Sequence, residues 1–346
     1  MSTREFNFRQ LPFSYKLSLV EMLDYKTRCC LRKCSASEQL LVDSFPISLK
    51  CVKLSQESEG LKVNSKMSHL KRIQCVTSRI EDPMFEFSIK EFDEFSADIC
   101  NINTNSFDEL LMIFNHQFSI VDRLVFQGFH SNSSKTHFMN NLKQEILRKR
   151  NQLDTRELKI RIRKLCWNFS NDDGKHLVGF LKFVDPTVLR GLSIQSNIPV
   201  TTMKKLVKTE HWNNLESLVL VGQVAMPMGS LEHFKRFDIQ TKTLKVTDIW
   251  KVVQVFLFKD RPRLSGFTIC HENRLSVTDI FEPTIIPMKN EPVECVWGDI
   301  HHTQRFRMTT EANLFVLVIL DGWVQGFVGR EDSIDLEYLR FISNYF

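Results

Sequence analysis

Residues 11–43 read LPFSYKLSLVEMLDYKTRCCLRKCSASEQLLVD, and this segment predicts two or three short helices rather than one long helix. Pro12 suits the first turn of a helix, because its missing N–H would have no intrahelical partner there. Apolar residues recur at helical spacing as far as Leu23 and Asp24, where the first helix is expected to stop. The pattern restarts at Arg28 and closes with a Leu-Leu-Val run at 40–42.

The first predicted helix carries more apolar surface than one helical face can hide. Tyr15, Leu19, Met22 and Leu23 share a face through the three-to-four spacing, and Leu17 lies off that face. A unit of about 33 residues is too small to support a core of its own. The surplus surface therefore favours a segment that docks on a partner, and the alternative is a small helical cap on the following domain.

The order Leu-Pro, Leu-Asp, basic helix and Leu-Leu-Val-Asp resembles the F-box. More closely, LDYKTRCCLRKCS followed by LLVDSFPISL is similar to the F-box of a large nematode-expanded family that pairs it with a C-terminal FTH domain. The resemblance implies that the segment docks on the Skp-type adaptor of a cullin-based ubiquitin ligase, and that the rest of the chain recognises a protein substrate. By motif position, the residues implied in adaptor binding are Leu11, Pro12, Leu19, Val20, Leu23 and Asp24.

Length and composition are those of an ordinary globular protein. The chain has 346 residues, 42% hydrophobic and 25% charged, which suggests about two units. Nine cysteines without a C-x-x-C pair are typical of reduced thiols, so a cytoplasmic or nuclear location is expected. The N-terminus has no apolar signal region, and the longest apolar run, 314–320, is too short to span a bilayer, so no membrane association is expected.

Helix-like and strand-like segments alternate from residue 106 onward, after a strand expected at 46–54 and another within 84–102. Helical spacing is found at 107–117, 137–152, 174–184, 200–208 and 245–258. Strand patterns are found at 121–128, 158–162, 189–195, 215–222, 233–240 and 264–270. Such alternation predicts a parallel sheet covered by helices, stacked in the manner of leucine-rich repeats. The uneven repeat length argues against a closed barrel.

The resemblance to the FTH family continues through this region. The blocks VDPTVLRGLSI (184–194), TEHWNNLESLVLVG (209–222) and residues 231–269 are similar to successive blocks of the FTH domain.

Further along, apolar runs at 314–320 and 323–329 flank Asp321-Gly322, which predicts a β-hairpin. A helical pattern at 333–346 is expected to cap the open end of the sheet.

The predicted fold class is α/β, with an N-terminal helical F-box, a leucine-rich-repeat-like α/β repeat sheet, and a C-terminal β-hairpin with a capping helix. The expected segments are an F-box at 7–45, a connecting segment with strands at 46–105, an FTH-like repeat domain at 106–290 and the hairpin with its helix at 291–346.

The sequence favours no catalytic or cofactor site. Neither G-x-S-x-G nor a glycine-rich phosphate-binding motif occurs, so no enzymatic activity is expected. Cys295, Asp299, His301 and His302 match no common zinc spacing, and no metal or cofactor is expected. Residues 143–164 carry nine Lys or Arg against three Asp or Glu, which could contact nucleic acid, although solvated faces are the simpler interpretation.

The leading hypothesis is therefore a non-enzymatic substrate-recognition subunit of a Skp–cullin–F-box ubiquitin ligase. Residues 11–43 would bind the adaptor, and the repeat domain would bind a protein target. The alternatives are a repeat scaffold without a ligase role and a nucleic-acid-binding protein that uses residues 143–164.

Overall fold

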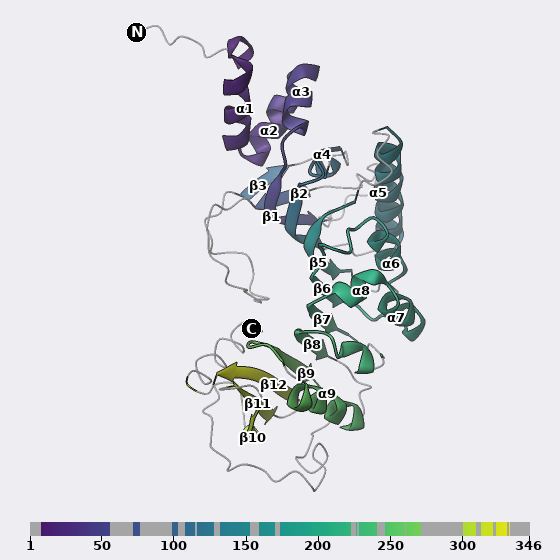
Figure 1. Cartoon of the computed structure of the whole chain (residues 1–346). Coiled ribbons are helices and arrows are strands. Elements are labelled where there is room, and N and C mark those ends of the chain that lie inside the picture. The colour runs from purple at the N-terminus through teal and green to yellow at the C-terminus, as the bar shows by residue number, and fades with distance from the viewer. Residues whose placement is uncertain are drawn as a thin grey trace. The chain divides into compact units, whose positions relative to one another are not determined.

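A computed structural model (Figure 1) describes residues 8–55, 72–76, 99–102, 108–114, 116–127, 132–152, 159–169, 174–222, 226, 228–240, 246–259, 261–270, 300–308, 313–320, 323–330 and 332. The chain divides into two compact units. Unit 1 comprises Met1–Ile80, Ser96–Lys164 and Phe183–Val188, and unit 2 comprises Glu81–Phe95, Leu165–Lys182 and Leu189–Phe346.

Unit 1 begins with three short helices, as the sequence predicts. After a 3₁₀ turn, η1 (Phe8–Gln10), come α1 (Phe13–Met22), α2 (Tyr25–Arg32) and α3 (Ala36–Asp43). Asp24 caps α2 by accepting a hydrogen bond from the Thr27 N–H at 2.7 Å, and Ser35 caps α3 in the same way. These caps end one helix and begin the next. We call α1, α2 and α3 the helical module.

The sheet strands of unit 1 follow directly. They are β1 (Ser48–Ser55), β2 (Arg72–Val76), β3 (Ile99–Ile102) and β4 (Ile120–Gln127), in the order β4-β1-β2-β3. β1 pairs parallel with β4 and antiparallel with β2, which confirms the strand expected after the helices. Of the strand expected within 84–102, residues 84–98 lie outside the described set. The helices are α4 (Asp108–Met112) and α5 (Asn132–Gln152), and Phe138 of α5 packs edge-on against Phe126 of β4.

Unit 2 contains the helix and strand alternation. The strands β6 (Gly191–Gln195), β7 (Ser217–Val221), β8 (Arg236–Gln240) and β9 (Gly266–Cys270) pair parallel in chain order, as predicted. The connecting elements are α6 (Lys175–Leu181), α7 (Val200–Val207), α8 (Glu210–Asn214), η2 (Met228–Leu231) and α9 (Val246–Phe258).

The antiparallel end of unit 2 is formed by β12 (Trp323–Arg330), β11 (Asn313–Leu320) and β10 (Ile300–Arg307). β12 pairs with β9 on one side and with β11 on the other, and β10 follows. The predicted antiparallel strand pair is therefore confirmed. Residues 321–322 at its turn, and the helix predicted at 333–346, lie outside the described residues.

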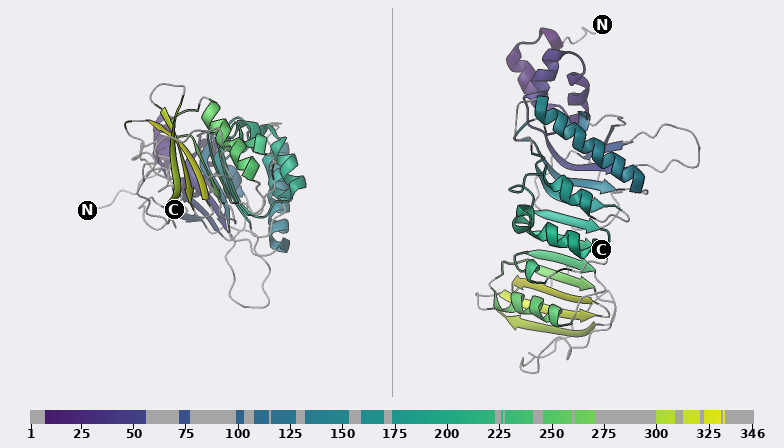
Figure 2. Two further views of the ribbon diagram at one scale, coloured as in Figure 1. Left: turned by 90° about the horizontal axis from the view of Figure 1, so that it is seen from below. Right: turned by 90° about the vertical axis from the view of Figure 1, so that its right-hand side faces the viewer.

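Alternate side chains of the parallel strands form one apolar face, which the helices of unit 2 cover (Figure 2). Phe256 of α9 packs against Phe237 of β8 and Phe267 of β9, with ring centroids 6.2 and 5.0 Å apart. The strand residues of this face are all buried: Leu192, Ile194, Leu218, Leu220, Phe237, Ile239, Phe267 and Ile269. Burial of each such side chain stabilises the fold by about 2 kcal/mol.

One strand prediction is wrong in position. The strand expected at 158–162 is β5 (Ile162–Asn168), and Ile160 forms only an isolated bridge to Val184. The true strand buries Leu165 and Trp167. The boundary between the two compact units falls within β5.

Among the described helices, none combines the length and apolar content needed to cross a bilayer.

Candidate functional site

The helical module has a small core made of its own side chains. Val20 of α1 and Leu41 and Val42 of α3 are buried there, and partly buried apolar residues pack around them: Phe8, Leu17, Leu31 and Phe45. The three helices therefore bury part of their apolar surface against one another.

The six residues implied in adaptor binding differ in their exposure to solvent. Val20 is 0% exposed, so its assignment as a docking residue is corrected: it holds the module together from inside. Leu11, Leu19 and Leu23 are half-buried, while Pro12 and Asp24 are exposed. The carboxylate of Asp24 caps α2, which is a structural role at an exposed position.

Apolar side chains also point away from this core. Tyr15 is 65% exposed and Met22 is 62% exposed, and half-buried Leu19 lies between them on α1. Positions 15, 19 and 22 follow the four-and-three spacing that places side chains along one helix face. We call Tyr15, Leu19 and Met22 the exposed stripe. Phe13 and Leu40 are further exposed apolar residues of the module.

Sequence periodicity indicates which residues form this stripe, but it does not indicate which side of α1 faces outward from the module. The spacing groups Tyr15, Leu19, Met22 and Leu23 on one face, and of these Tyr15 and Met22 are exposed while Leu19 and Leu23 are half-buried. Val20 is implied in docking by motif position alone. Val20 follows Leu19 by one residue, which turns its side chain about 100° around the helix and toward α3. Phe13 and Leu40 were missed, because no apolar spacing marks them as outward-facing.

A buried arginine fixes the end of α1. Arg28 of α2 donates from Nε to the Leu23 carbonyl at 3.1 Å, from Nη2 to Glu21 at 3.0 Å and from Nη1 to Pro46 at 3.2 Å. The last carbonyls of a helix lack intrahelical donors, so this guanidinium satisfies them. Burial lowers the pKa of Arg28, and the nearby Glu21 charge partly offsets the effect. Arg28 therefore joins α1, α2 and the segment between α3 and β1.

A second link holds α2 to α3. Arg32 donates from Nε and Nη2 to the two carboxylate oxygens of Asp43, at 2.8 and 3.1 Å. Such a two-point pair fixes orientation as well as distance. The module thus presents the exposed stripe from helices whose relative positions are fixed by side-chain bonds.

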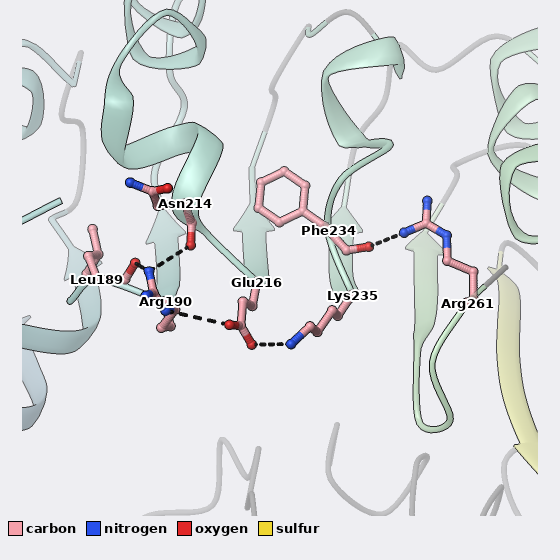
Figure 3. A network of polar contacts seen from close by, with 7 residues as sticks. All are labelled: Leu189, Arg190, Asn214, Glu216, Phe234, Lys235 and Arg261. Carbon is pink, nitrogen blue, oxygen red and sulfur yellow. Dashed lines mark hydrogen bonds and ion pairs between the residues drawn. The ribbon is translucent and has the colours of Figure 1, made fainter. Parts of the chain in front are cut away.

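Unit 2 carries a different polar network at the entry to its parallel strands (Figure 3). Arg190 donates to the Asn214 carbonyl at 3.3 Å and pairs with Glu216, which also accepts from Lys235 at 2.8 Å. One repeat further, Arg261 donates to the Phe234 carbonyl at 3.1 Å. A basic side chain thus binds a backbone carbonyl at the entry to the neighbouring strand twice, once between β6 and β7 and once between β8 and β9. This network connects repeats and is a structural feature.

The aromatic residues of the FTH-like blocks are also structural. Trp212 is buried, donates from Nε1 to the Ser230 carbonyl at 3.2 Å and packs edge-on against Phe234. His233 Nε2 lies 2.8 Å from the Trp212 carbonyl, so its tautomer carries the proton on Nε2 and donates it. Burial lowers the pKa of His233. These hydrogen bonds and ring contacts fix the position of η2 relative to α8.

Several cations of the basic segment 143–164 have partners within unit 1. Arg163 donates to Asp122 at 2.9 Å, Arg161 lies 3.6 Å from Asp185, and the Arg150 guanidinium lies over the Phe183 ring. Arg148 pairs with Glu145 within α5. Asp122 and Asp185 therefore offset part of the local positive charge that the sequence alone suggests.

The sequence patch considered for metal binding lies largely outside the described residues. Cys295 and Asp299 are not described, and His301 and His302 lie in β10 with undescribed side chains. Among the residues that the structure does describe, no three potential ligands gather into a metal site.

Fold and site together define a mixed α/β protein with a large sheet and an N-terminal helical module that exposes apolar side chains. The family model of the FTH domain matches residues 144–284, which supports an FTH-domain protein. The FTH domain is a family associated with F-box proteins. Comparison with curated proteins returned no match, and neither did comparison with solved structures.

Proposed function

We propose that this protein is the substrate-recognition subunit of a Skp–cullin–F-box ubiquitin ligase. The helical module acts as an F-box and binds the Skp-type adaptor, and the FTH domain binds a protein target. The module contributes no chemistry of its own. It raises the effective concentration of the target near the transferring enzyme, which increases the transfer rate without any new contact.

The observation that carries this proposal is the exposed stripe on a module whose helices are already fixed. Arg28 and Arg32 hold the helices in place, yet Tyr15 and Met22 each keep more than half of their surface in water. Burying a large apolar side chain against a partner is worth about 1.5–3 kcal/mol. Three such residues on one helix face suit a helix that docks in an apolar groove. The FTH match to residues 144–284 supports the same class of protein.

The test is capture of a purified Skp-type adaptor by the full chain. We expect the double variant Tyr15→Lys, Met22→Lys to lose capture, because two charges would be buried at the contact. Since both side chains are exposed, the variant should keep its far-UV circular dichroism spectrum. The matched control is Phe258→Lys, which changes an apolar residue of unit 2 that is 74% exposed and should leave capture intact.

Two outcomes would count against the proposal. Capture that survives the double variant would reject the exposed stripe as the docking site. A wild-type chain that captures no adaptor would support the alternative, a repeat scaffold without a ligase role. If the chain instead bound nucleic acid, binding should weaken steeply between low and moderate salt, because phosphate contacts release counterions.

A further inference from the structure

The loop that joins α9 to β9 in unit 2 exposes a large apolar side chain at each end. Phe258, the last residue of α9, is 74% exposed, and Leu264, two residues before β9, is 54% exposed. Among the described residues of unit 2, the next most exposed large apolar side chain is Val200, at 43%. Six residues span at most about 20 Å, so one short peptide can contact both ends of the loop.

Leu264 adopts a backbone conformation that favours glycine. Its φ is +67°, and it is the single non-glycine residue with a positive φ in the described part of the chain. The Ser265 N–H donates to the Pro262 carbonyl at 3.1 Å, which closes a β-turn with Leu264 at its third position. Glycine suits a positive φ there, because it lacks the Cβ that crowds the neighbouring carbonyl. The turn therefore gives no reason for a leucine, and backbone strain of this kind is found at functional sites.

Hydrogen bonds on two sides hold this backbone in place. The Leu264 N–H donates to the Val328 carbonyl at 2.8 Å, and the Val328 N–H donates to the Ser265 carbonyl at 2.8 Å. On the other side, Arg261 is 8% exposed and donates to the Phe234 carbonyl at 3.1 Å (Figure 3). The loop thus presents Leu264 from a fixed backbone, so little ordering of the loop would oppose binding of a partner.

Basic side chains lie between the two apolar residues along the chain. The segment 259–263 reads KDRPR, with three basic residues against one acidic residue. Arg263 is exposed, and Lys259 pairs with Glu232 while 54% of its side chain stays exposed. This charge is small for a membrane-binding surface, which generally uses a cluster of about four to eight Lys or Arg. A protein segment that carries apolar and acidic side chains together is the better match.

We propose that Phe258, Arg263 and Leu264 form a docking site for a short segment of a protein partner that combines apolar and acidic residues. The apolar side chains of the partner would cover Phe258 and Leu264. Its carboxylate would pair with the Arg263 guanidinium, whose planar shape suits a carboxylate. This inference rests on the proposed function in taking the FTH domain as the part that recognises the substrate, and it names the chemistry of that recognition.

The experiment is selection of a phage-displayed library of random heptapeptides on the full chain, followed by fluorescence polarisation with the enriched peptides. We expect these peptides to combine apolar residues with Asp or Glu. Leu264→Gly should weaken their binding about ten- to hundredfold, because one large apolar contact is lost. The same variant should unfold at a temperature no lower than that of the wild type, because glycine suits the positive φ.

Two further variants test the other parts of the site. Phe258→Ala should weaken peptide binding about tenfold, and Arg263→Gln should do so only for peptides that keep their acidic residue. The matched control is Val200→Ala, which shortens another exposed apolar side chain of unit 2, in α7, and should leave peptide binding unchanged.

Several results would overturn the site: enriched peptides without acidic residues, binding that survives Leu264→Gly, or failure to enrich any peptide. A lower unfolding temperature for Leu264→Gly would also overturn it, because the leucine would then serve packing. So would binding to phosphatidylserine vesicles that Leu264→Gly abolishes, because the occupant would then be a membrane. Adaptor capture is measured on the same proteins, and its absence in the wild type beside intact peptide binding would reject only the ligase role.

Discussion

Single residues fix the helices of the helical module relative to one another, and Arg28 is the clearest case. Its guanidinium binds three backbone carbonyls from two segments, at 3.0 to 3.2 Å, and only 8% of the residue is exposed. Arg28→Met keeps most of the side-chain volume but leaves these carbonyls without donors. We expect it to lower the free energy of unfolding by about 3 kcal/mol.

Urea denaturation followed by circular dichroism measures this effect. Lys50→Met is the control, because it removes an exposed basic side chain from the same unit and should change the midpoint little. Arg28→Lys keeps the charge with fewer donors and should fall between the wild type and Arg28→Met. Equal midpoints for Arg28→Met and Lys50→Met would show that the three hydrogen bonds contribute nothing to stability.

Asp238 gives a residue-scale prediction whose sign depends on pH. Its pKa is raised from 3.8 to about 7 in the folded protein. Between these values the folded state binds more protons than the unfolded state, so the contribution of Asp238 to stability is lost as pH rises. Asp238→Asn should therefore stabilise the protein at pH 8 by on the order of 3 kcal/mol relative to the wild type, and much less at pH 4.

The measurement is the difference in urea midpoint between wild type and Asp238→Asn at the two pH values. Comparing the two proteins at each pH cancels the titration of all other groups that the substitution leaves unchanged. A difference that stays constant from pH 4 to pH 8 would mean that Asp238 titrates normally. A gain in stability from removing Asp238 would fit a residue retained for binding rather than for folding.

At the scale of elements, the sequence predicts whether a segment is a helix or a strand better than it predicts where that segment begins and ends. The apolar alternation of β6 to β9 and the long helix α9 are strong periodic signals, and both are confirmed. β5 was placed too early, because charged residues at 161, 163 and 164 interrupt a strand whose buried Leu165 and Trp167 come later. α8 was missed, since five residues are too few for periodicity and only the Thr209 cap marks its start.

Gly326 tests how closely the antiparallel strands pack. A Cβ added there would lie 2.3 Å from the Phe267 ring and 2.8 Å from the Phe315 ring, both buried. Gly326→Ala should destabilise the protein by about 2 kcal/mol, because two packed rings must shift. Gly179→Ala is the control: nothing lies within 4 Å of its added Cβ, and alanine favours a helix, so it should be neutral or slightly stabilising. Thermal unfolding would contradict the packing argument if both variants behaved alike.

At the scale of the whole molecule, sequence reasoning located the candidate sites only in part. The surplus of apolar residues in 11–43 indicated a docking segment, but which of Val20 and Met22 faces outward depends on how α1 meets α3. The register that sets Asp238 beside Thr268 could not be foreseen, because the two residues are 30 positions apart and meet only through the pairing of β8 and β9. Long-range pairing of this kind leaves no local pattern in a single sequence.

The exposed stripe belongs to unit 1 and Asp238 to unit 2, so we expect substitutions at the two places to act independently. Substitutions that share no partner are usually additive. Tyr15→Lys with Met22→Lys should abolish adaptor capture and leave the urea midpoint close to that of the wild type, because both side chains are exposed. Asp238→Asn should do the reverse: it should raise the urea midpoint at pH 8 and leave adaptor capture intact. The triple variant should show both effects while keeping its circular dichroism spectrum. A change in adaptor capture in Asp238→Asn, or in the urea midpoint in the double variant, would show that the two units depend on each other, contrary to a receptor whose adaptor-binding module and FTH domain act independently.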